Sequence, residues 1–499
     1  MNDLLPGVAI DNFNQLDGRQ HFLLSNANNV RGLESLGPYL EQGDSLDPAV
    51  RRRLFCTKIS CSFVLSQFDS IKPRYVTEME LNKPVTLMVN SDSSDGGGGY
   101  TLRVTPVDAN HCPGSVMFLF ERLHEGKVEK RILYTGDFRF ENREMLSRQS
   151  ALHDDQRKPL KIDEIYLDTT FLTTSFKHFP SRKAAENKVW ELVKDWVSRN
   201  AKIKSRAKNR KKFVVLLHFP AQFGYENILN MIYNRSRCEW RVHVPSVKFA
   251  KYLCHNSLHD STDNDPTEAE YVHACGPNNT PNFERCQNSL PCQPDAKNLQ
   301  ILHIKASAMY FDNDVVGDGD VVHSLVSSTK DCQRYRICYS THSSFSEMQS
   351  FVQYYAPVKI IPCVIPTDSD KETLQKTLDE MLKPVEMVHS CSEDGDSQDD
   401  SAKAGMEAKK RGGEEFTDEA DEAKCGRFAL NESYSLLDNS CNLLDDSISL
   451  LEQDLEDDET PDIEDLIKEA EMKGWSEHAM KPMKEFKRRK DEMIVIDDD

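Results

Sequence analysis

The chain has 499 residues, more than one compact core usually holds, so we expect one large composite domain or two domains in close contact. Residues 386–499 carry 35 acidic and 14 basic residues, whereas residues 1–385 have a net charge of only +1. No run of about 20 apolar residues and no secretory signal are present, so we expect an intracellular protein without a membrane segment. The fourteen cysteines form no Cys-x-x-Cys pair, which favours reduced thiols over a disulfide framework or a zinc ribbon.

Short apolar runs separated by turn residues fill the first 170 residues and predict stacked β-sheets. The expected strands cover residues 22–24, 59–65, 85–89, 100–106, 116–120, 132–134 and 165–167. Apolar residues at helical spacing predict a helix over residues 183–199, and a strand is expected at residues 213–217. Later in the chain we expect loops with a short strand at 271–274, strands at 299–304, 321–326 and 335–340, and helices at 347–355 and 371–382. This order predicts an α/β protein: an αββα sandwich interrupted by an inserted domain.

The C-terminal segment, residues 386–499, differs from the rest in composition. Residues 392–422 are charged and nearly free of large apolar side chains, so we expect the tail to be disordered. Leucines alternate with acids over residues 436–451. This pattern is typical of segments that bind partners on folding, and a weak satellite helix is the alternative.

Three residues that could bind a metal each follow a predicted strand. His111 stands before a Pro113-Gly114 turn, which would make its imidazole project from the strand end. Asp137 follows the strand 132–134 and Asp168 follows the strand 165–167. One imidazole and two carboxylates that converge on one sheet edge can bind a divalent metal such as zinc, which lowers the pKa of a water ligand to about 7.

The three runs, residues 110–115, 133–139 and 166–171, resemble in order and spacing the motifs of the Artemis and DNA cross-link repair branch of the metallo-β-lactamase/β-CASP nucleases. Further similarity lies at residues 180–182, 224–226, 272–275 and 339–347, and it extends over residues 8 to 385. The resemblance implies a metallo-β-lactamase sandwich in residues 1–172 and 306–385, with an inserted β-CASP αβ domain in residues 173–305. The tail, residues 386–499, lies outside it.

The resemblance also implies roles for individual residues and a centre of one or two zinc ions. His111, Asp137 and His342 would be metal ligands, and Asp137, Asp168 and His342 would serve catalysis. His273, in the insert, would contact substrate or support the pocket.

Hydroxyl groups stand beside two of these residues. Thr169 follows Asp168 and Ser343 follows His342, and both could donate hydrogen bonds to a 5′-phosphate. Simple turn capping is the alternative.

The sequence departs from the family at its first metal motif, His-x-His-x-Asp-His, which should follow residues 22–25. Asn26 and Asn28 stand where the two leading histidines are expected, and about two residues that would supply the Asp and the last His are absent. An amide oxygen is a weak zinc ligand, so too few donors remain for an ordinary two-zinc centre. Three interpretations stay open: a pseudonuclease that binds DNA ends or repair partners, a weak nuclease with one metal, or a sequence from which a short segment is missing.

Other features suggest partners. Residues 202–212 carry seven basic residues and no acid, so that Lys208, Lys211 and Lys212 are candidate DNA contacts, although such a run can also be a solvated loop. The basic cluster at 484–490 is consistent with nuclear import. The run from Ile494 through Val495 to Ile496 precedes three acids and looks like a SUMO-interacting motif.

The function expected is that of an Artemis-like DNA-repair nuclease, a 5′-exonuclease or hairpin endonuclease in end joining or cross-link repair.

Overall fold

The fold is that of a computed structural model, which describes residues 5–28, 31–43, 51–89, 99–202, 211–253, 255–276, 289–311, 322–324, 332–363 and 371–383. The predicted disordered tail (386–499), Lys208 and the Ile494–Ile496 run lie outside the described residues.

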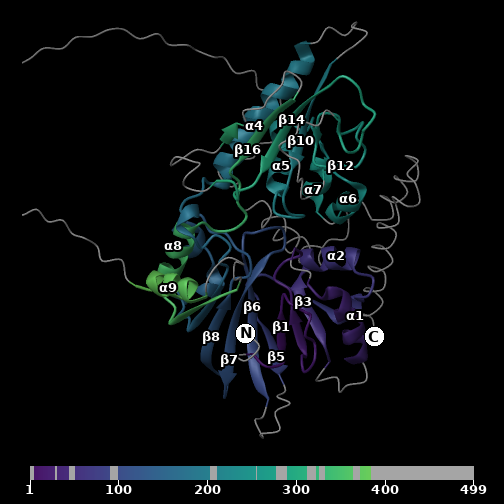
Figure 1. Ribbon diagram of the computed structural model, residues 1–499. Helices are drawn as coiled ribbons and strands as arrows, with labels where there is room; N and C mark the ends of the chain where they lie inside the picture. Colours follow the sequence, from purple (N-terminus) through teal and green to yellow (C-terminus); the bar gives the residue numbers. More distant parts are fainter. Residues whose placement is uncertain are drawn as a thin grey trace, which may run out of the picture. The chain divides into compact units, whose positions relative to one another are not determined.

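Two β-sheets packed face to face form one part of the described chain (Figure 1). All pairs in the first sheet are parallel, and its strands in order are β1 (Val8–Ile10), β2 (His21–Leu23), β3 (Arg53–Thr57) and β4 (Val76–Met79). The second sheet is parallel over its first three strands and antiparallel over the rest, in the order β17 (Lys359–Pro362), β9 (Glu164–Leu167), β8 (Lys127–Tyr134), β7 (Val116–His124), β6 (Tyr100–Asp108) and β5 (Val85–Val89).

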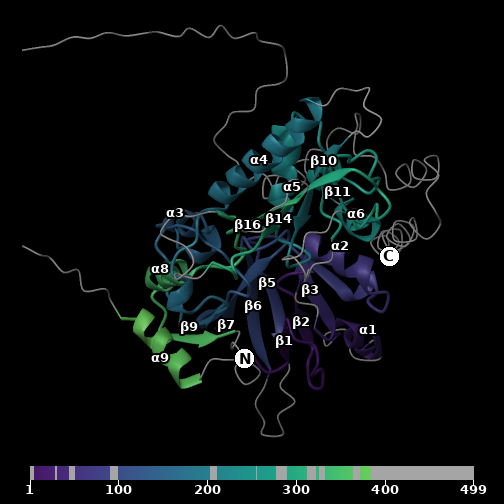
Figure 2. The same ribbon diagram turned by 45° about the horizontal axis from the view of Figure 1, so that its top comes forward.

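Helices cover the outer face of each sheet, which gives the sandwich four layers (Figure 2). The first sheet packs against α1 (Leu33–Gln42) and α2 (Lys58–Gln67). The second packs against α3 (Arg143–Ser147), α8 (Phe345–Tyr355) and α9 (Lys371–Met381). Short 3-10 turns occur at Pro73–Tyr75, Ser150–Leu152, Thr174–Phe176 and Arg199–Lys202.

Strand β7 has a nearly continuous apolar sequence because both of its faces are buried. Phe118 and Phe120 face the core between the two sheets, whereas Met117 and Leu119 face the core under α3 and α8. Successive side chains of a strand point to opposite faces, so a strand buried on both faces needs an apolar residue at every position. Burial on both faces fixes the register of the strands that end at the candidate site.

The segment predicted as a strand at residues 59–65 is instead part of helix α2, so that prediction is wrong. Thr57 caps the helix by accepting a hydrogen bond from the backbone N–H of Ser60. Phe63 and Val64 are buried against different cores, so the helix has apolar residues on more than one side. A short apolar run of this kind has no clear period and cannot be distinguished from a buried strand by its pattern.

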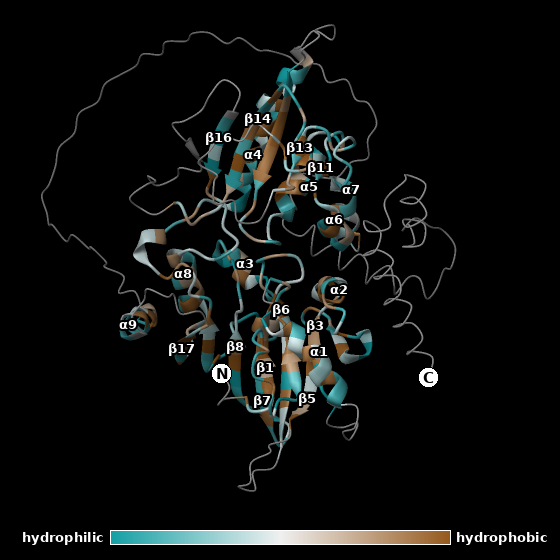
Figure 3. Ribbon diagram, turned by 45° about the vertical axis from the view of Figure 1, so that its right-hand side comes forward, coloured by the Kyte–Doolittle hydropathy of each residue, from teal (hydrophilic) through white to brown (hydrophobic). Residues whose placement is uncertain are grey.

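A third sheet belongs to the inserted segment. Its strands in order are β12 (Thr262–Asp263), β11 (Val242–His243), β13 (Val272–His273), β10 (Lys212–His218), β14 (Leu299–Ala306), β16 (Cys332–Ile337) and β15 (Val322–Ser324). The helices of the segment are α4 (Arg182–Ser198), α5 (Glu226–Arg235), α6 (Ser246–Tyr252) and α7 (Asn256–Ser261). Figure 3 shows apolar residues concentrated in the middle strands of this sheet and hydrophilic residues in β16. Val215 and Leu217 face the core with α4 and α5, and Val214 and Leu216 face a smaller core on the other side.

The sheet of the insert continues past the boundary expected between residues 305 and 306, because β16 pairs in parallel with β14. No helix in the described part of the chain is both long enough and apolar enough to cross a membrane.

Candidate functional site

Four residues predicted to form the site lie close together in the structure. His111 lies between β6 and β7, Asp137 follows β8, Asp168 follows β9, and His342 lies between β16 and α8. His342 Nδ1 is 2.7 Å from Asp168 Oδ2, and His111 Nε2 is 3.8 Å from Asp137 Oδ2. The two imidazole rings are 4.7 Å apart, so all four side chains share one site.

The parallel pairing of β8 with β9 explains how two of these residues meet. Strands that run in the same direction bring the residues after their C-terminal ends to one sheet edge, as they do for Asp137 and Asp168. Gly136 allows the close approach to the loop after β2: its φ is +50°, and a Cβ there would lie 2.8 Å from Ser25 Oγ. A larger residue before Asp137 would displace that loop.

Asp168, which is buried, and His342, which is half-buried, form a charge-assisted pair. Burial alone would lower the pKa of His342, but the Asp168 carboxylate raises it above its ordinary value. Burial alone would raise the pKa of Asp168, but His342 holds it below its ordinary value, and hydrogen bonds from Thr170 add to this effect. Because Nδ1 of His342 is engaged with Asp168, its Nε2 is the nitrogen available to a ligand.

His111 is a neutral ring with a fixed tautomer. Its Nδ1 lies 2.9 Å from the Thr341 carbonyl oxygen, which can only accept, so Nδ1 carries the proton and Nε2 is an acceptor. Burial and the neighbouring His342 ring lower the pKa of His111 to about 4.

Two buried arginines hold the loop that carries His342. Arg139 donates to the Ser340 carbonyl at 2.9 Å and pairs with Glu347 at 3.1 Å. Arg182 donates to the carbonyls of Ser340 and Thr341. Both arginines stand in runs that carried the resemblance, but their positioning role could not be read from the sequence.

The amide groups of Asn26 and Asn28 replace two family ligands, and hydrogen bonds fix their orientation. Asn26 Oδ1 accepts from the backbone N–H of Asn28, so its amino group must face Asp137, with Nδ2 to Oδ2 at 3.3 Å. Asn28 Oδ1 accepts from the backbone N–H of Phe223, so its amino group must face His111, with Nδ2 to Nε2 at 3.5 Å. An N–H group cannot ligate a cation, so the described residues do not fit an ordinary two-zinc centre.

The other half of the site does fit one metal ion. Asp137, Asp168 and His342 offer donor atoms that all lie within 4.8 Å of one another. Two carboxylates and an imidazole form a donor set typical of divalent cations.

Another buried carboxylate, which the sequence did not single out, lies behind Asp137. Asp11 accepts hydrogen bonds from Ser25 N at 2.7 Å, Ser25 Oγ at 2.6 Å and the Tyr134 hydroxyl at 2.9 Å. Burial raises the pKa of Asp11 to about 7 despite these hydrogen bonds. Asp11 therefore anchors Ser25, immediately before Asn26.

Comparison with known proteins gives consistent matches. A model of the DNA repair metallo-beta-lactamase family matches residues 258–368. The chain is 31% identical over 405 residues to Protein artemis of Danio rerio, which covers 78% of the chain and 56% of the relative. It is 32% identical over 397 residues to Protein artemis of Mus musculus, covering 76% and 49%, and 24% identical over 324 residues to 5′ exonuclease Apollo of Rattus norvegicus, covering 63% and 47%. The chain belongs to the Artemis and DNA cross-link repair family.

Family membership confirms the expected metallo-β-lactamase fold class. The chain spans about half the length of the curated Artemis relatives that it matches.

Several of the described residues that were expected to contact substrate have local partners in the structure. Ser343 Oγ lies 3.3 Å from the Phe138 carbonyl and 3.4 Å from the Phe140 N–H, which favours turn capping over phosphate binding. Thr169 is buried beside Asp168. Lys212 Nζ pairs with Glu270 at 3.2 Å, and Lys211 immediately precedes strand β10.

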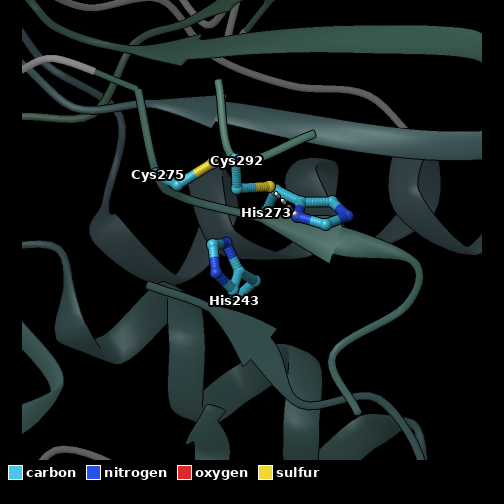
Figure 4. A group of neighbouring side chains, drawn as sticks. All are labelled: His243, His273, Cys275 and Cys292. Carbon is cyan, nitrogen blue, oxygen red and sulfur yellow. Dashed lines mark hydrogen bonds between the residues drawn. The ribbon is translucent and has the colours of Figure 1, made fainter. Parts of the chain in front are cut away.

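His273 belongs to a second group of possible metal ligands, on the insert sheet. Figure 4 shows His243, His273, Cys275 and Cys292 facing one another. One donor atom of each lies within 4.8 Å of the others, and His273 Nδ1 is 3.5 Å from Cys292 Sγ. Two thiols and two imidazoles match the donor set that zinc prefers in structural sites. All four are buried or half-buried, and both cysteines are free thiols.

The sequence contained part of this signal. His273 and Cys275 are two residues apart at the end of β13, and alternate residues of a strand share a face. His243 is the register partner of His273 on β11. Cys292 comes from a later loop with no local motif, so a search for Cys-x-x-Cys pairs could not find the group.

Proposed function

We propose that this protein is a DNA-repair nuclease of the Artemis type that works with one divalent cation in its active site. The observation that carries the proposal is the convergence of Asp137, Asp168 and His342, with donor atoms within 4.8 Å of one another, in a chain of this family. The substrates would be 5′-phosphorylated single strands or DNA hairpins. The cellular roles would be end joining or interstrand cross-link repair in the nucleus.

The residues that would hold the cation are Asp137, Asp168 and His342. A divalent cation here supplies Lewis acidity, which neutralises charge on a phosphodiester and favours ionisation of water. The chain contributes orientation: Asp168 fixes the His342 ring through Nδ1. Arg182 and Arg139 hold the carbonyls of the loop that carries His342, so the ligands are positioned before a cation binds.

The nuclease proposal is tested by comparing cleavage and binding in three proteins. Wild type, Asp137→Ala and the exposed control Asp17→Ala are incubated with 5′-phosphorylated single strands and hairpins in Mg²⁺, Mn²⁺ or Zn²⁺. We expect wild type and Asp17→Ala to cut and Asp137→Ala to bind DNA without cutting, because one of the few carboxylate ligands is lost. If wild type binds DNA but cuts no substrate with any ion, the amides of Asn26 and Asn28 favour the alternative, a pseudonuclease that binds DNA ends.

DNA contact is proposed for the basic run that includes Lys208, Lys211 and Lys212. Cations that neutralise phosphates release counterions, so affinity falls steeply with salt. Replacement of Lys208 and Lys211 by Ala should reduce the slope of log affinity against log salt by about 2. A slope equal to that of wild type in filter binding would exclude these lysines as phosphate contacts.

We also propose a structural zinc ion at His243, His273, Cys275 and Cys292, in place of the substrate contact first expected for His273. Such an ion would join β11 and β13 to the loop that carries Cys292. Metal analysis of the purified chain should find about one zinc per chain, retained in Asp137→Ala and lost in Cys275→Ser and Cys292→Ser. Zinc retained in both cysteine variants would contradict the proposal.

Partner binding is proposed for the C-terminal tail, including SUMO binding by Ile494, Val495 and Ile496. A pull-down with SUMO-coated beads compares the full chain with a chain lacking residues 493–499. Equal capture of both chains would exclude the motif.

A further inference from the structure

The loop after β2 and the loop before α5 are joined at the candidate site by a single side chain. Asn28 Nδ2 donates to the Phe223 carbonyl at 3.3 Å, and Asn28 Oδ1 accepts from the Phe223 N–H at 3.3 Å. The Asn28 amide therefore bonds both the N–H and the C=O of Phe223, in the way that the backbone of a neighbouring β-strand would. Asn28 belongs to the lactamase sandwich and Phe223 to the insert, so this contact crosses between them.

Aromatic packing supports the same contact. The Phe223 ring stacks on Phe63 of α2, with centroids 4.3 Å apart and parallel planes. Next to it, Lys251 of the insert donates to Gln67 of α2 at 3.0 Å. Phe223 is fully buried, so its backbone groups need protein partners.

Gly224 permits the close approach of this loop. Its φ is +111°, and a Cβ there would lie 2.7 Å from Thr341 Cγ2 and 3.3 Å from the His111 carbonyl oxygen. Only glycine brings the insert loop this close to His111 of the candidate site and to Thr341 beside it.

We infer that Asn28 is a positioning residue that fastens the insert loop at Phe223 to the site without a metal. The Asn28 amino group that donates to the Phe223 carbonyl also faces His111 Nε2. In the same way, the Asn26 amino group faces the Asp137 carboxylate. His111 and Asp137, which would be left to ligate a metal at the position of the lost motif, are thus contacted by the neutral amides of Asn28 and Asn26. Sequence change at Asn26 and Asn28 has replaced metal ligation by a hydrogen-bonded join between the sandwich and the insert, here called the Asn28 join.

The Asn28 join predicts a specific dependence on metal. In Cys275→Ser, which lacks the zinc proposed for the insert, hydrogen exchange at the Phe223 amide should be equally slow in EDTA and in zinc, because no ion takes part in the Asn28 join. Asn28→Ala should speed this exchange roughly fivefold in both conditions, since the Phe223 N–H loses the hydrogen bond that it donates to Asn28 Oδ1. Asn14→Ala, an exposed asparagine, is the control and should leave the exchange unchanged.

Peptide-resolved hydrogen exchange over residues 219–226 of the full chain is the measurement. Asn28→Leu provides a second variant if Asn28→Ala does not fold, because it keeps the approximate size of the side chain and loses both the acceptor and the donor to Phe223; its exchange should be faster as well. A third variant, Asn26→His with Asn28→His, restores the two imidazoles of the family motif. Exchange at the Phe223 amide of this variant should be fast in EDTA and slower in zinc, a dependence that packing alone would not produce.

Two results would overturn the inference: exchange in Cys275→Ser that accelerates on addition of EDTA, or exchange in Asn28→Ala and Asn28→Leu equal to that of wild type. Neither depends on DNA cleavage, so they are separate from a failure of the proposed function.

Discussion

Replacement of Asp11 by Asn should change how stability depends on pH. Asp11 is buried behind Asp137, and burial raises its pKa from 3.8 to about 7. A group whose pKa is raised by folding contributes stability that is full below the unfolded pKa and is lost as pH rises through the folded pKa. The wild-type free energy of unfolding should therefore fall as pH rises from about 4 to about 7.

The size of the effect follows from the shift. One pKa unit corresponds to about 1.4 kcal/mol, so the full shift is worth about 4 kcal/mol, of which about 2.5 kcal/mol is lost between pH 5 and pH 8. Asparagine has no titration in this range. Its amide can still accept from Ser25 N and donate to Ser25 Oγ or the Tyr134 oxygen.

Urea denaturation at pH 5, 6, 7 and 8 measures this change. The difference in the free energy of unfolding between Asp11→Asn and wild type should shift in favour of the variant by about 2.5 kcal/mol from pH 5 to pH 8. Asp17→Asn, at an exposed position, should show no such shift. A difference between Asp11→Asn and wild type that stays constant with pH would refute the reasoning.

Three further substitutions test the packing around the site. Gly224→Ala should lower the free energy of unfolding by about 2 kcal/mol more than Gly126→Ala, because both have positive φ but only the first places a Cβ against Thr341; chemical denaturation of both variants tests this. Arg182→Met should cost at least about 3 kcal/mol in the same assay, since several buried carbonyls lose their donor, and a loss under 1 kcal/mol would contradict the role given to this arginine. Phe63→Ala should cost about 3 to 5 kcal/mol, and thermal melts that overlay wild type would show that the stacked ring is dispensable.

Three of the four candidate site residues could be singled out from the sequence because each one stands next to a predicted strand. Asp137 and Asp168 follow parallel neighbours, and a parallel pair must bring its C-terminal ends to one edge. His111 needed only the Pro-Gly turn after its strand. His342 could be placed through the resemblance alone, because the strand before it, β16, belongs to the insert sheet.

Features that depend on distant contacts could not be predicted. The orientation of the Asn28 amide is set by Phe223, which lies 195 residues away in the chain. Cys292 joins His273 only through the fold of the insert, and no local spacing indicates this. Helix α2 was mistaken for a strand because Phe63 packs with the insert, and this burial removes the polar face that marks a surface helix.

The pairing of β17 with β9 has a consequence for biosynthesis. Ile361 lies opposite Tyr166, so the edge strand of the second sheet is synthesised only after the whole insert. Until then β9 has an open edge with unpaired backbone groups, which can pair with other chains. We expect a message truncated before the codon for Lys359 to give aggregated protein. We also expect the insert to fold before β17 pairs, because a folded insert shortens the effective loop between β9 and β17.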